Sequence, residues 1–149
     1  MKQQAYITGG TGLIGKNLRY FLYKKDIPTV VLSRKLIKLY SNEVHRKYSL
    51  GDEILPEDKK AKHFFYHLAH DFYDKRNDKN NINHIGLKLI IKSFDNIKAK
   101  KFIFFSTPDV NNIVGTVYTR QKLLAEKLFD ESRDVILRPS LITQGYKDK

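Results

Sequence analysis

The sequence of 149 residues has no cysteine, no tryptophan and only four prolines. Without cysteine, neither a disulfide nor a thiolate metal site can form, and this absence fits a reducing compartment. No apolar run approaches the roughly 20 residues of a membrane-spanning helix, and the opening segment MKQQAYITGG lacks the apolar stretch of a signal peptide. The sequence therefore predicts a cytoplasmic protein without a membrane partner.

Acidic residues are also few, with 16 Asp and Glu against 28 Lys and Arg, which leaves a net charge of +12. So large a positive charge raises the question of a nucleic-acid partner. The basic residues are spread along the chain, however, and their longest runs are pairs such as Lys24-Lys25 and Lys100-Lys101. This distribution favours a solvated surface, and attraction to an anionic small molecule, over nucleic-acid binding.

Apolar residues make up 41% of the chain, which is enough for one core, so we expect a single domain over residues 1–149. Short apolar runs typical of strands alternate with segments of helical periodicity. The predicted strands cover residues 4–8, 29–33, 63–69, 101–106 and part of 134–140, and the predicted helices cover 13–25, 81–97 and 115–129. This alternation predicts an α/β fold: a doubly wound parallel sheet of order 3-2-1-4-5-6 with helices on both faces.

The stretch between the second and the fourth strand is short and ambiguous. Residues 35–45 have the pattern of a short helix, and residues 47–50 have that of a weak strand. We therefore expect a short or ragged third strand. The compressed segment also predicts that the third crossover helix is missing.

The most specific motif follows the first predicted strand. Gly9, Gly12 and Gly15 have the spacing G-x-x-G-x-x-G at the mouth of a helix. In that context the first glycine permits a tight turn, the second lets the backbone approach a pyrophosphate, and the third lets helix and strand pack closely. The helix start, with Leu13 and Ile14, offers N–H groups and a positive dipole end to an anion. A glycine triplet alone also occurs in ordinary turns, but this context predicts a dinucleotide cofactor.

The end of the second strand, VVLSRK, indicates which dinucleotide binds. NAD sites usually place Asp or Glu there to accept a hydrogen bond from the ribose 2′-hydroxyl, and this strand has neither. Ser33 can hydrogen-bond a 2′-phosphate, and Arg34 can pair with it. The sequence therefore favours NADP, and NAD remains an alternative in which Arg34 is only an exposed loop residue.

The segment from Gly115 to Phe129 has helical periodicity and places Tyr118 and Lys122 four residues apart. The same stripe holds Ala125 and Phe129, so Lys122 faces the interior. A charge is unusual in such a position. Either the lysine extends its ammonium to solvent along its own stem, or something in the interior uses it.

Taken in order, several motifs are similar to those of one known family. They are ITGGTGLIG, HLAH, NINHIGLKLI, KFIFFST, YTRQK and ILRPSLI, and they span the chain from Ile7 to about Ile142. The set resembles the extended short-chain dehydrogenase/reductase family, which includes the NAD(P)-dependent epimerases and dehydratases of nucleotide sugars. The resemblance implies an NAD(P)-binding Rossmann domain and an oxidoreductase or epimerase. It also implies a nucleotide sugar or a small carbonyl compound as substrate.

The resemblance assigns catalysis to Thr107, Tyr118 and Lys122, with Ser106 beside the threonine. In the family the lysine holds the nicotinamide ribose, and its ammonium helps to stabilise the phenolate. Tyr118 would then take up or release a substrate proton as hydride moves, while Thr107 hydrogen-bonds the reacting oxygen. In the alternative, Thr107 caps the turn before Pro108.

The resemblance also places further residues along the cofactor. Leu68, Ala69 and His70 match a segment whose backbone lies beside the dinucleotide. His70 replaces a small residue there, and either crowds the adenosine side or points to solvent. Asn83 matches a residue that helps to order the active site, and Pro139 belongs to a motif near the nicotinamide carboxamide. The other histidines lack ligand-like spacing with carboxylates, so the sequence predicts no metal site.

Two departures from the family leave the function open. The loop between Thr107 and Tyr118 is shorter than usual, and the chain ends soon after RPSLITQG, before the family's C-terminal substrate lobe. One hypothesis is an NADP-dependent oxidoreductase or epimerase whose pocket is completed by a partner chain, a homo-oligomer or a small substrate. The others are a dinucleotide-binding module without turnover and a truncated or split epimerase half. The intact catalytic residues favour the first.

Overall fold

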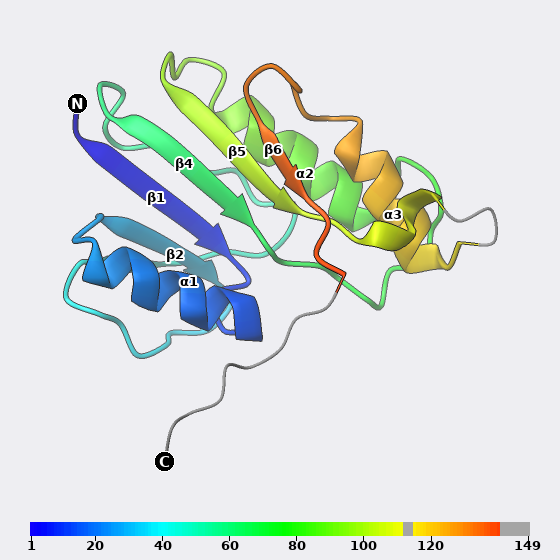
Figure 1. The fold of residues 1–149 in the computed structure, drawn as a ribbon, viewed down its shortest axis with the longest axis horizontal. Helices are drawn as coiled ribbons and strands as arrows, with labels where there is room; N and C mark the ends of the chain where they lie inside the picture. The colour runs from blue at the N-terminus through cyan, green and yellow to red at the C-terminus, as the bar shows by residue number, and fades with distance from the viewer. Residues whose placement is uncertain (112–114, 141–149) are drawn as a thin grey trace.

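The described residues form one sheet of six parallel strands. In the computed structural model, which describes residues 1–111 and 115–140, the strand order is β3-β2-β1-β4-β5-β6 (Figure 1). The strands are β1 (Gln3–Thr8), β2 (Thr29–Ser33), β3 (Glu43–Lys47), β4 (Lys62–His67), β5 (Lys100–Phe105) and β6 (Val135–Leu137). Each neighbouring pair is parallel, so all the carboxyl ends lie at one edge of the sheet. The predicted strand order is confirmed.

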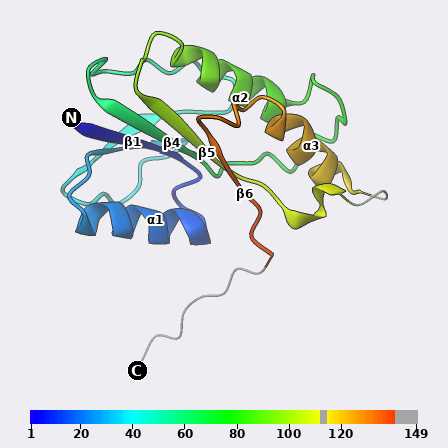
Figure 2. The ribbon, with the colours of Figure 1, turned by 45° about the horizontal axis from the view of Figure 1, so that its top comes forward.

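Helices cover both faces of the sheet. The helix α1 (Leu13–Lys24) lies on one face, and α2 (Ile82–Ser93) and α3 (Val117–Glu126) lie on the other (Figure 2). The short 3₁₀ helix η1 (Pro108–Asn111) precedes α3. This is a doubly wound, Rossmann-like α/β fold, as predicted. Within the described ranges, no helix has both the length and the apolar character needed to cross a membrane.

The helices differ in how their first turns are satisfied. The Asn81 side chain accepts a hydrogen bond from the His84 N–H at 2.9 Å at the start of α2, and the Thr116 hydroxyl accepts one from the Thr119 N–H at 3.3 Å at the start of α3. These caps satisfy N–H groups that have no partner within the helix. In contrast, the N-cap residue of α1, Gly12, provides no side-chain hydrogen bond to the first turn.

The larger hydrophobic core lies between the sheet and the helices α2 and α3. At its centre the ring of Phe94 meets the ring of Tyr6 edge-on at 5.2 Å, and that of Phe65 at 5.5 Å, between centroids. A smaller core that includes Ala5 and Leu22 lies beneath α1. Close packing of this kind holds α2 and α3 in fixed positions over the sheet.

The segment between β2 and β4 differs from the sequence prediction. Residues 35–45 contain no helix, because β3 begins at Glu43 within them, so the predicted short helix is wrong. The strand predicted at residues 47–50 is also misplaced, since β3 pairs with β2 from Glu43 to Lys47. It is short but fully paired. The structure describes all of residues 34–61 and places no helix there, which confirms the missing crossover helix.

A buried ion pair explains why the chain is extended before β3. Arg19 of α1 donates from Nε and Nη2 to the carboxylate of Glu43 at 2.8 and 2.7 Å. The Arg19 and Glu43 side chains are 8% and 0% exposed. The same carboxylate accepts the Tyr40 N–H at 2.8 Å, and Arg19 also donates to the Lys38 carbonyl at 2.7 Å. These contacts with α1 replace the hydrogen bonds of a local helix.

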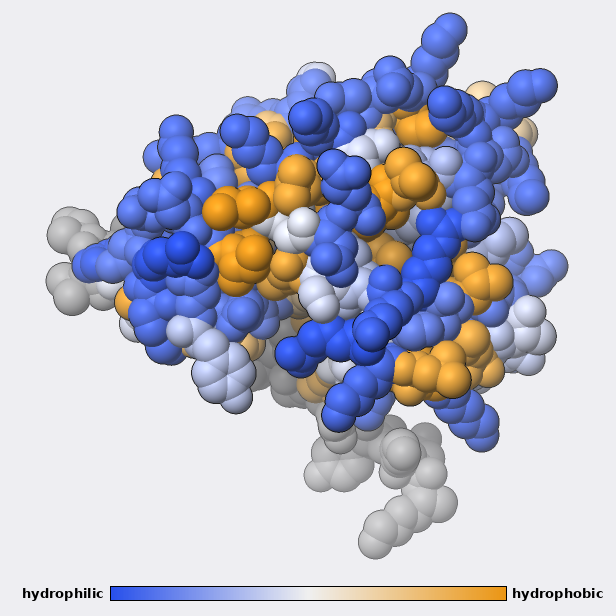
Figure 3. All heavy atoms as spheres, turned by 180° about the vertical axis from the view of Figure 1, so that it is seen from behind, coloured by the Kyte–Doolittle hydropathy of each residue, from blue (hydrophilic) through white to orange (hydrophobic). Residues whose placement is uncertain are grey.

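The side of the molecule opposite to the view of Figure 1 is mainly hydrophilic (Figure 3). Apolar side chains appear there in separate patches between polar ones. Ile85 of α2 and Leu123 of α3 remain 38% and 37% exposed. On their other sides, α2 contributes Leu87 and Ile90 and α3 contributes Ala125 to the larger core.

Removal of the Glu43 carboxylate should destabilise the fold strongly. We expect Glu43→Ala to lower the free energy of unfolding by about 3–5 kcal/mol, because the Arg19 guanidinium would stay buried without its partner. Urea denaturation of both proteins measures the difference. Glu57→Ala is the matched control, since Glu57 pairs with Arg46 but its side chain is 70% exposed, and it should cost at most about 1 kcal/mol. Equal losses in the two variants would contradict the structural role assigned to the buried pair.

Candidate functional site

The predicted site residues come together at the carboxyl edge of the sheet, around β1, β4 and β5. The chain leaves β1 for α1 on one face and leaves β4 for α2 on the other (Figure 1). Such a topological switch point is where open α/β sheets bind ligands. The glycine triplet follows β1, and beside it β4 ends at His67 and is followed by Leu68 and Ala69.

Two glycines of the triplet are required by the packing of the protein itself. Gly9 has φ +71°, and a Cβ there would lie 2.9 Å from the backbone N of Ala69 and 2.9 Å from the carbonyl carbon of Leu68. A Cβ on Gly15 would lie only 2.3 Å from the Gly9 carbonyl oxygen. Any side chain at these positions would push the turn away from β4 or α1 away from the turn.

Gly12 has the opposite surroundings, because it is exposed and faces open space. Among residues 1–111 and 115–140, the only neighbouring atom within 4 Å of a Cβ placed on Gly12 is the Gly9 carbonyl oxygen, at 3.5 Å. Gly12 is also the uncapped N-terminal residue of α1, where Leu13 and Ile14 begin the helix. Uncapped N–H groups, the positive dipole end and an open backbone surface fit the pyrophosphate of a dinucleotide.

At the end of β2, the two residues predicted to contact a 2′-phosphate, Ser33 and Arg34, have different surroundings. The Ser33 hydroxyl donates to the Lys35 carbonyl at 2.8 Å and lies 2.9 Å from Nε2 of His45. Its proton is therefore already used within the loop. Arg34 is exposed, and no ion pair of its guanidinium is present among the described residues. Of the two, Arg34 is the one that stays exposed to solvent. No motif in the sequence indicated His45.

The end of β4 is tied to the end of β1 through Thr8. The Thr8 Oγ1 accepts the N–H groups of Leu68 and Ala69 at 3.2 and 3.3 Å, and it lies 2.9 Å from Nδ1 of His67. Because Oγ1 already accepts twice, its proton is directed to His67, whose neutral ring then carries hydrogen on Nε2. Burial, and then the charge of Lys122, lowers the pKa of His67 to about 3. His67 is therefore a neutral structural group.

Lys122 faces the interior, as its stripe predicted, and does not reach solvent. The residue is 3% exposed, and its ammonium donates to the Phe105 carbonyl at 2.7 Å. The ammonium lies 4.7 Å from the ring centroid of Phe104 and 5.5 Å from that of Tyr118. Burial lowers the pKa of Lys122 to about 8, against an opposing effect of Glu126. Such a lysine lies close to its switch between charged and neutral forms near neutral pH.

Tyr118 is half-buried in a cluster of rings that includes residues of the β4–α2 loop, residues 68–81. His70 meets its ring edge-on at 4.8 Å, and Phe72 stacks on it at 5.5 Å with 16° between planes. His70 therefore points to the phenol rather than to solvent. Burial raises the pKa of Tyr118 and lowers that of His70 to about 4. In this arrangement the lysine lies against the tyrosine ring, and burial dominates the phenol's pKa.

The hydroxyls after β5 are buried, with Ser106 6% and Thr107 8% exposed. Thr107 Oγ1 accepts the Asp109 N–H at 3.4 Å, which is the turn-capping contact of the alternative hypothesis. The segment η1 that follows packs against α3, the helix of Tyr118 (Figure 1). Thr107 is thus on the correct edge of the sheet, with one of its acceptor positions used by the turn.

The end of β6 is engaged in an ion pair. Arg138 donates from Nε and Nη2 to the Glu126 carboxylate at 2.9 and 2.5 Å. Burial raises the pKa of Glu126, but the hydrogen bonds from Arg138 and Ser106 and the positive charges of Arg138 and Lys122 together outweigh it, so the net shift is downward. Pro139 follows and is partly buried, whereas Ile142, where the family resemblance ends, lies outside the described residues.

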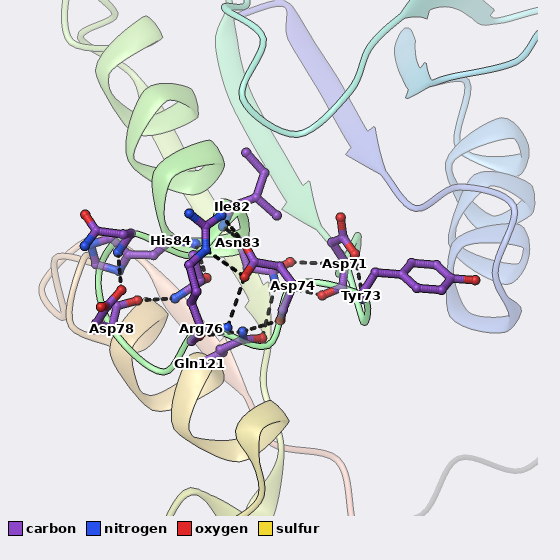
Figure 4. Close-up of polar contacts among 11 residues, drawn as sticks. Asp71, Tyr73, Asp74, Arg76, Asp78, Ile82, Asn83, His84 and Gln121 are labelled. Atoms are coloured by element: carbon purple, nitrogen blue, oxygen red, sulfur yellow. Dashed lines mark hydrogen bonds and ion pairs between the residues drawn. The ribbon is translucent and has the colours of Figure 1, made fainter.

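A polar network missed by the sequence analysis connects α2, α3 and the β4–α2 loop (Figure 4). Asn83 accepts the Asp71 N–H at 2.7 Å and donates to the Asp71 carbonyl at 2.9 Å and to Oε1 of Gln121 at 3.2 Å. Gln121 in turn donates to the carbonyls of Asp74 and Arg76 at 2.7 and 2.8 Å. Asn83, the predicted ordering residue, thus holds the backbone of the loop at Asp71. Within residues 1–111 and 115–140, no His, Asp and Glu residues cluster in a way that could hold a metal ion.

Comparison with known proteins shows likeness of fold only. No protein-family model and no curated protein sequence matches this chain. The enzyme WbmH of Bordetella bronchiseptica, solved with NAD+, has a TM-score of 0.73 and 15% identity, with 94% of this chain and 57% of WbmH covered. Gre2 of Candida albicans, solved with NADPH, has a TM-score of 0.68 and 18% identity over 89% of this chain and 55% of Gre2. The oxidoreductase YlbE of Lactococcus lactis has a TM-score of 0.72 and 16% identity over 97% of this chain and 72% of YlbE.

These likenesses confirm the Rossmann fold that the resemblance to extended short-chain dehydrogenases/reductases implied. The chain spans 57% of WbmH and 55% of Gre2, roughly half of each.

The buried ammonium of Lys122 should make stability depend on pH in a defined window. Its pKa is lowered from 10.5 to about 8, so between these values the unfolded chain binds more protons and the contribution of Lys122 to stability rises with pH. Wild type should therefore gain stability relative to Lys122→Met as the pH rises from about 8 to 10.5. We expect this relative gain in the free energy of unfolding to be on the order of 2 kcal/mol. Urea denaturation at several pH values measures it. Lys127→Met, which removes an exposed lysine, should show no such trend, and a constant difference for Lys122→Met would contradict the lowered pKa.

Proposed function

We propose that this chain binds a nicotinamide dinucleotide, NADP(H) in preference to NAD(H), across the carboxyl ends of β1 and β4. The observation that carries the proposal is the open backbone of Gly12 at the uncapped N-terminus of α1. Gly9 and Gly15 hold this turn against β4 and α1, so the surface is built before any ligand arrives. A preformed anion site of this kind costs little reorganisation on binding.

The same placement suggests a role for each neighbouring residue. The N–H groups of Leu13 and Ile14 would receive the pyrophosphate. Arg34, exposed at the end of β2, would pair with a 2′-phosphate, and Ser33 would support that loop through Lys35. Leu68 and Ala69, held beside Gly9 by Thr8, would line the dinucleotide from β4.

For the chemistry, we propose hydride transfer to or from a nucleotide sugar or a small carbonyl compound, as in an epimerase, dehydratase or reductase. When bound, the nicotinamide supplies or accepts the hydride. Tyr118 would hold or release the proton of the substrate oxygen, and Thr107 would hydrogen-bond that oxygen. Lys122 would bind the ribose hydroxyls, exchanging its bond to the Phe105 carbonyl for them. A partner chain or a second copy of this chain would complete the substrate pocket.

The surroundings of Tyr118 and Lys122 favour a second candidate, an NADP(H)-binding module without turnover. Phe72 stacks on the Tyr118 ring, burial raises the pKa of the phenol, and the lysine ammonium is bound to a backbone carbonyl. A general acid–base works best when its pKa is near the ambient pH, and this environment moves Tyr118 in the opposite direction. In that case the function would lie in the binding of the dinucleotide itself, as a signal or as a means of stabilising a complex.

Arg34→Ala should weaken NADPH selectively. We expect a loss of about 1–3 kcal/mol for NADPH and almost none for NADH, because only NADPH carries the charged group that Arg34 would contact. Calorimetric titration of both cofactors with wild type and variant measures this.

Two further variants serve as controls for the cofactor titration of Arg34→Ala. Lys35→Ala removes a positive charge from the same loop and should weaken NADPH less than Arg34→Ala does. Gly12→Val should weaken both cofactors, since its side chain would occupy the open space at the start of α1. Equal losses of NADPH and NADH in Arg34→Ala would show that Arg34 does not read the 2′-phosphate.

Tyr118→Phe separates the enzyme from the binding module. We expect cofactor affinity to stay nearly constant and single-turnover hydride transfer to fall by roughly 10²–10⁴-fold, because only the phenolic oxygen is lost. The matched control is Tyr73→Phe, which removes the hydroxyl of a tyrosine that is 94% exposed and should change neither quantity.

Lys122→Met should impair both cofactor binding and hydride transfer, and the double variant of Tyr118 and Lys122 should be no slower than the worse single variant. Turnover retained in Tyr118→Phe would end the catalytic assignment, whereas cofactor binding without turnover in wild type would favour the module.

A further inference from the structure

Gln121 lies on α3 between Tyr118 and Lys122 and is one of the most buried polar residues that the structure describes. It lies three residues after Tyr118 and one before Lys122, and it is 1% exposed. No step of the proposed chemistry uses it. A buried carboxamide that is not a ligand must be satisfied by the protein, and its partners show what it holds in place.

The hydrogen bonds of Gln121 join it to two other elements, and its carboxamide also interacts with the His70 imidazole. Nε2 uses its two hydrogens on the carbonyls of Asp74 and Arg76, at 2.7 and 2.8 Å. Oε1 accepts from Nδ2 of Asn83 at 3.2 Å. The side chain therefore joins α3 to the β4–α2 loop and to the first turn of α2, as Figure 4 shows.

The loop is held from its other side as well. Asn83 bonds both the N–H and the carbonyl of Asp71, at 2.7 and 2.9 Å. The Asp74 carboxylate accepts the Ile82 N–H at 2.7 Å, where α2 begins. The backbone is thus fixed at Asp71, Asp74 and Arg76 by side chains from two helices. Without Gln121, two of these carbonyls would be left without their partner in a poorly hydrated position.

The fixed part of the loop carries the rings that surround Tyr118. His70 and Phe72 flank Asp71, the residue that Asn83 holds by both backbone groups. Their rings lie 4.8 and 5.5 Å from that of Tyr118, although Phe72 is itself 61% exposed. An exposed ring on a surface loop keeps such a stacked position only if the backbone beneath it is fixed.

We propose that Gln121 is the positioning residue of this site: it holds the β4–α2 loop so that His70 and Phe72 enclose the ring of Tyr118. Its effect on turnover rests on the proposed function, whereas its effect on the loop does not. Gln121 acts through Asn83 and the loop backbone and needs no contact with cofactor or substrate. It sets how much of the phenol remains open for a ligand, and in what environment.

The test is a titration of the His70 imidazole by NMR, with the resonance assigned through the variant His70→Asn. In wild type His70 should titrate near the pKa of about 4 that its burial produces. Gln121→Met keeps an unbranched side chain of similar length but has no hydrogen bonds to offer. In this variant release of the loop should expose His70 and move it away from Lys122, which should raise its pKa by at least about one unit toward the ordinary 6.5 although the raising effect of Gln121 itself is lost. The ring-current shifts from Tyr118 and Phe72 should shrink.

Leu123→Met is the matched control, because it places the same side chain on the exposed side of α3 without removing a hydrogen bond. It should leave the His70 titration unchanged. If Gln121→Met does not fold, Gln121→Ala removes the same hydrogen bonds with a smaller side chain and is titrated in its place. An unchanged or lowered His70 pKa in a folded variant would overturn the proposal.

Cofactor titration of the same proteins separates this inference from the proposed function. Where hydride transfer is observed, Gln121→Met should lower kcat about 10-fold and leave NADPH affinity within about twofold, because the phenol is misplaced while the glycine turn is untouched. A shifted His70 in Gln121→Met supports the positioning role whatever the cofactor result. Failure of wild type to bind NADPH and NADH would overturn the proposed function alone.

Discussion

The close approach of the turn after β1 to the end of β4 is the constraint on which the site depends. At Gly9 the two backbones come so near that a single added carbon would lie 2.9 Å from atoms of Leu68 and Ala69. Gly15 allows α1 to begin directly against this turn. Thr8 then joins the two strand ends with its hydroxyl. Because of this packing, the uncapped start of α1 faces the same edge of the sheet as the residues that follow β4 and β5.

The second half of the site is positioned by the larger core. The helix α3 is anchored by Ala125, and Phe129 just beyond its end lies in the same apolar layer as α2. Lys122 stands one turn before Ala125 and is carried inward with it, which leaves the ammonium beneath the edge of the sheet. The burial of this lysine is also what lowers its pKa, so the position and the pKa of Lys122 have a single cause.

Sequence patterns were sufficient for the elements that local periodicity controls. Strand β2 occupies residues 29–33, as predicted, and the order of all six strands follows from alternation and the right-handed crossover rule. The helix predicted at residues 35–45 failed for a reason that no local pattern contains. Arg19, 24 residues away from Glu43 in the chain, binds its carboxylate and draws the segment into an extended path.

The sequence by itself determined the turn and helix chemistry of the site: the glycine spacing, the missing acid after β2, and the four-residue spacing of Tyr118 and Lys122. These depend on neighbours within one or two turns of chain, so the pattern of residues is enough to predict them. Only the tertiary structure decided which polar groups are already occupied. The Ser33 hydroxyl is bonded within its own loop, beside His45 of the adjacent strand, and Gln121 reaches a carbonyl 47 residues away. A hydrogen bond between distant segments exists only once packing has brought them together, and it leaves no periodic trace in the sequence.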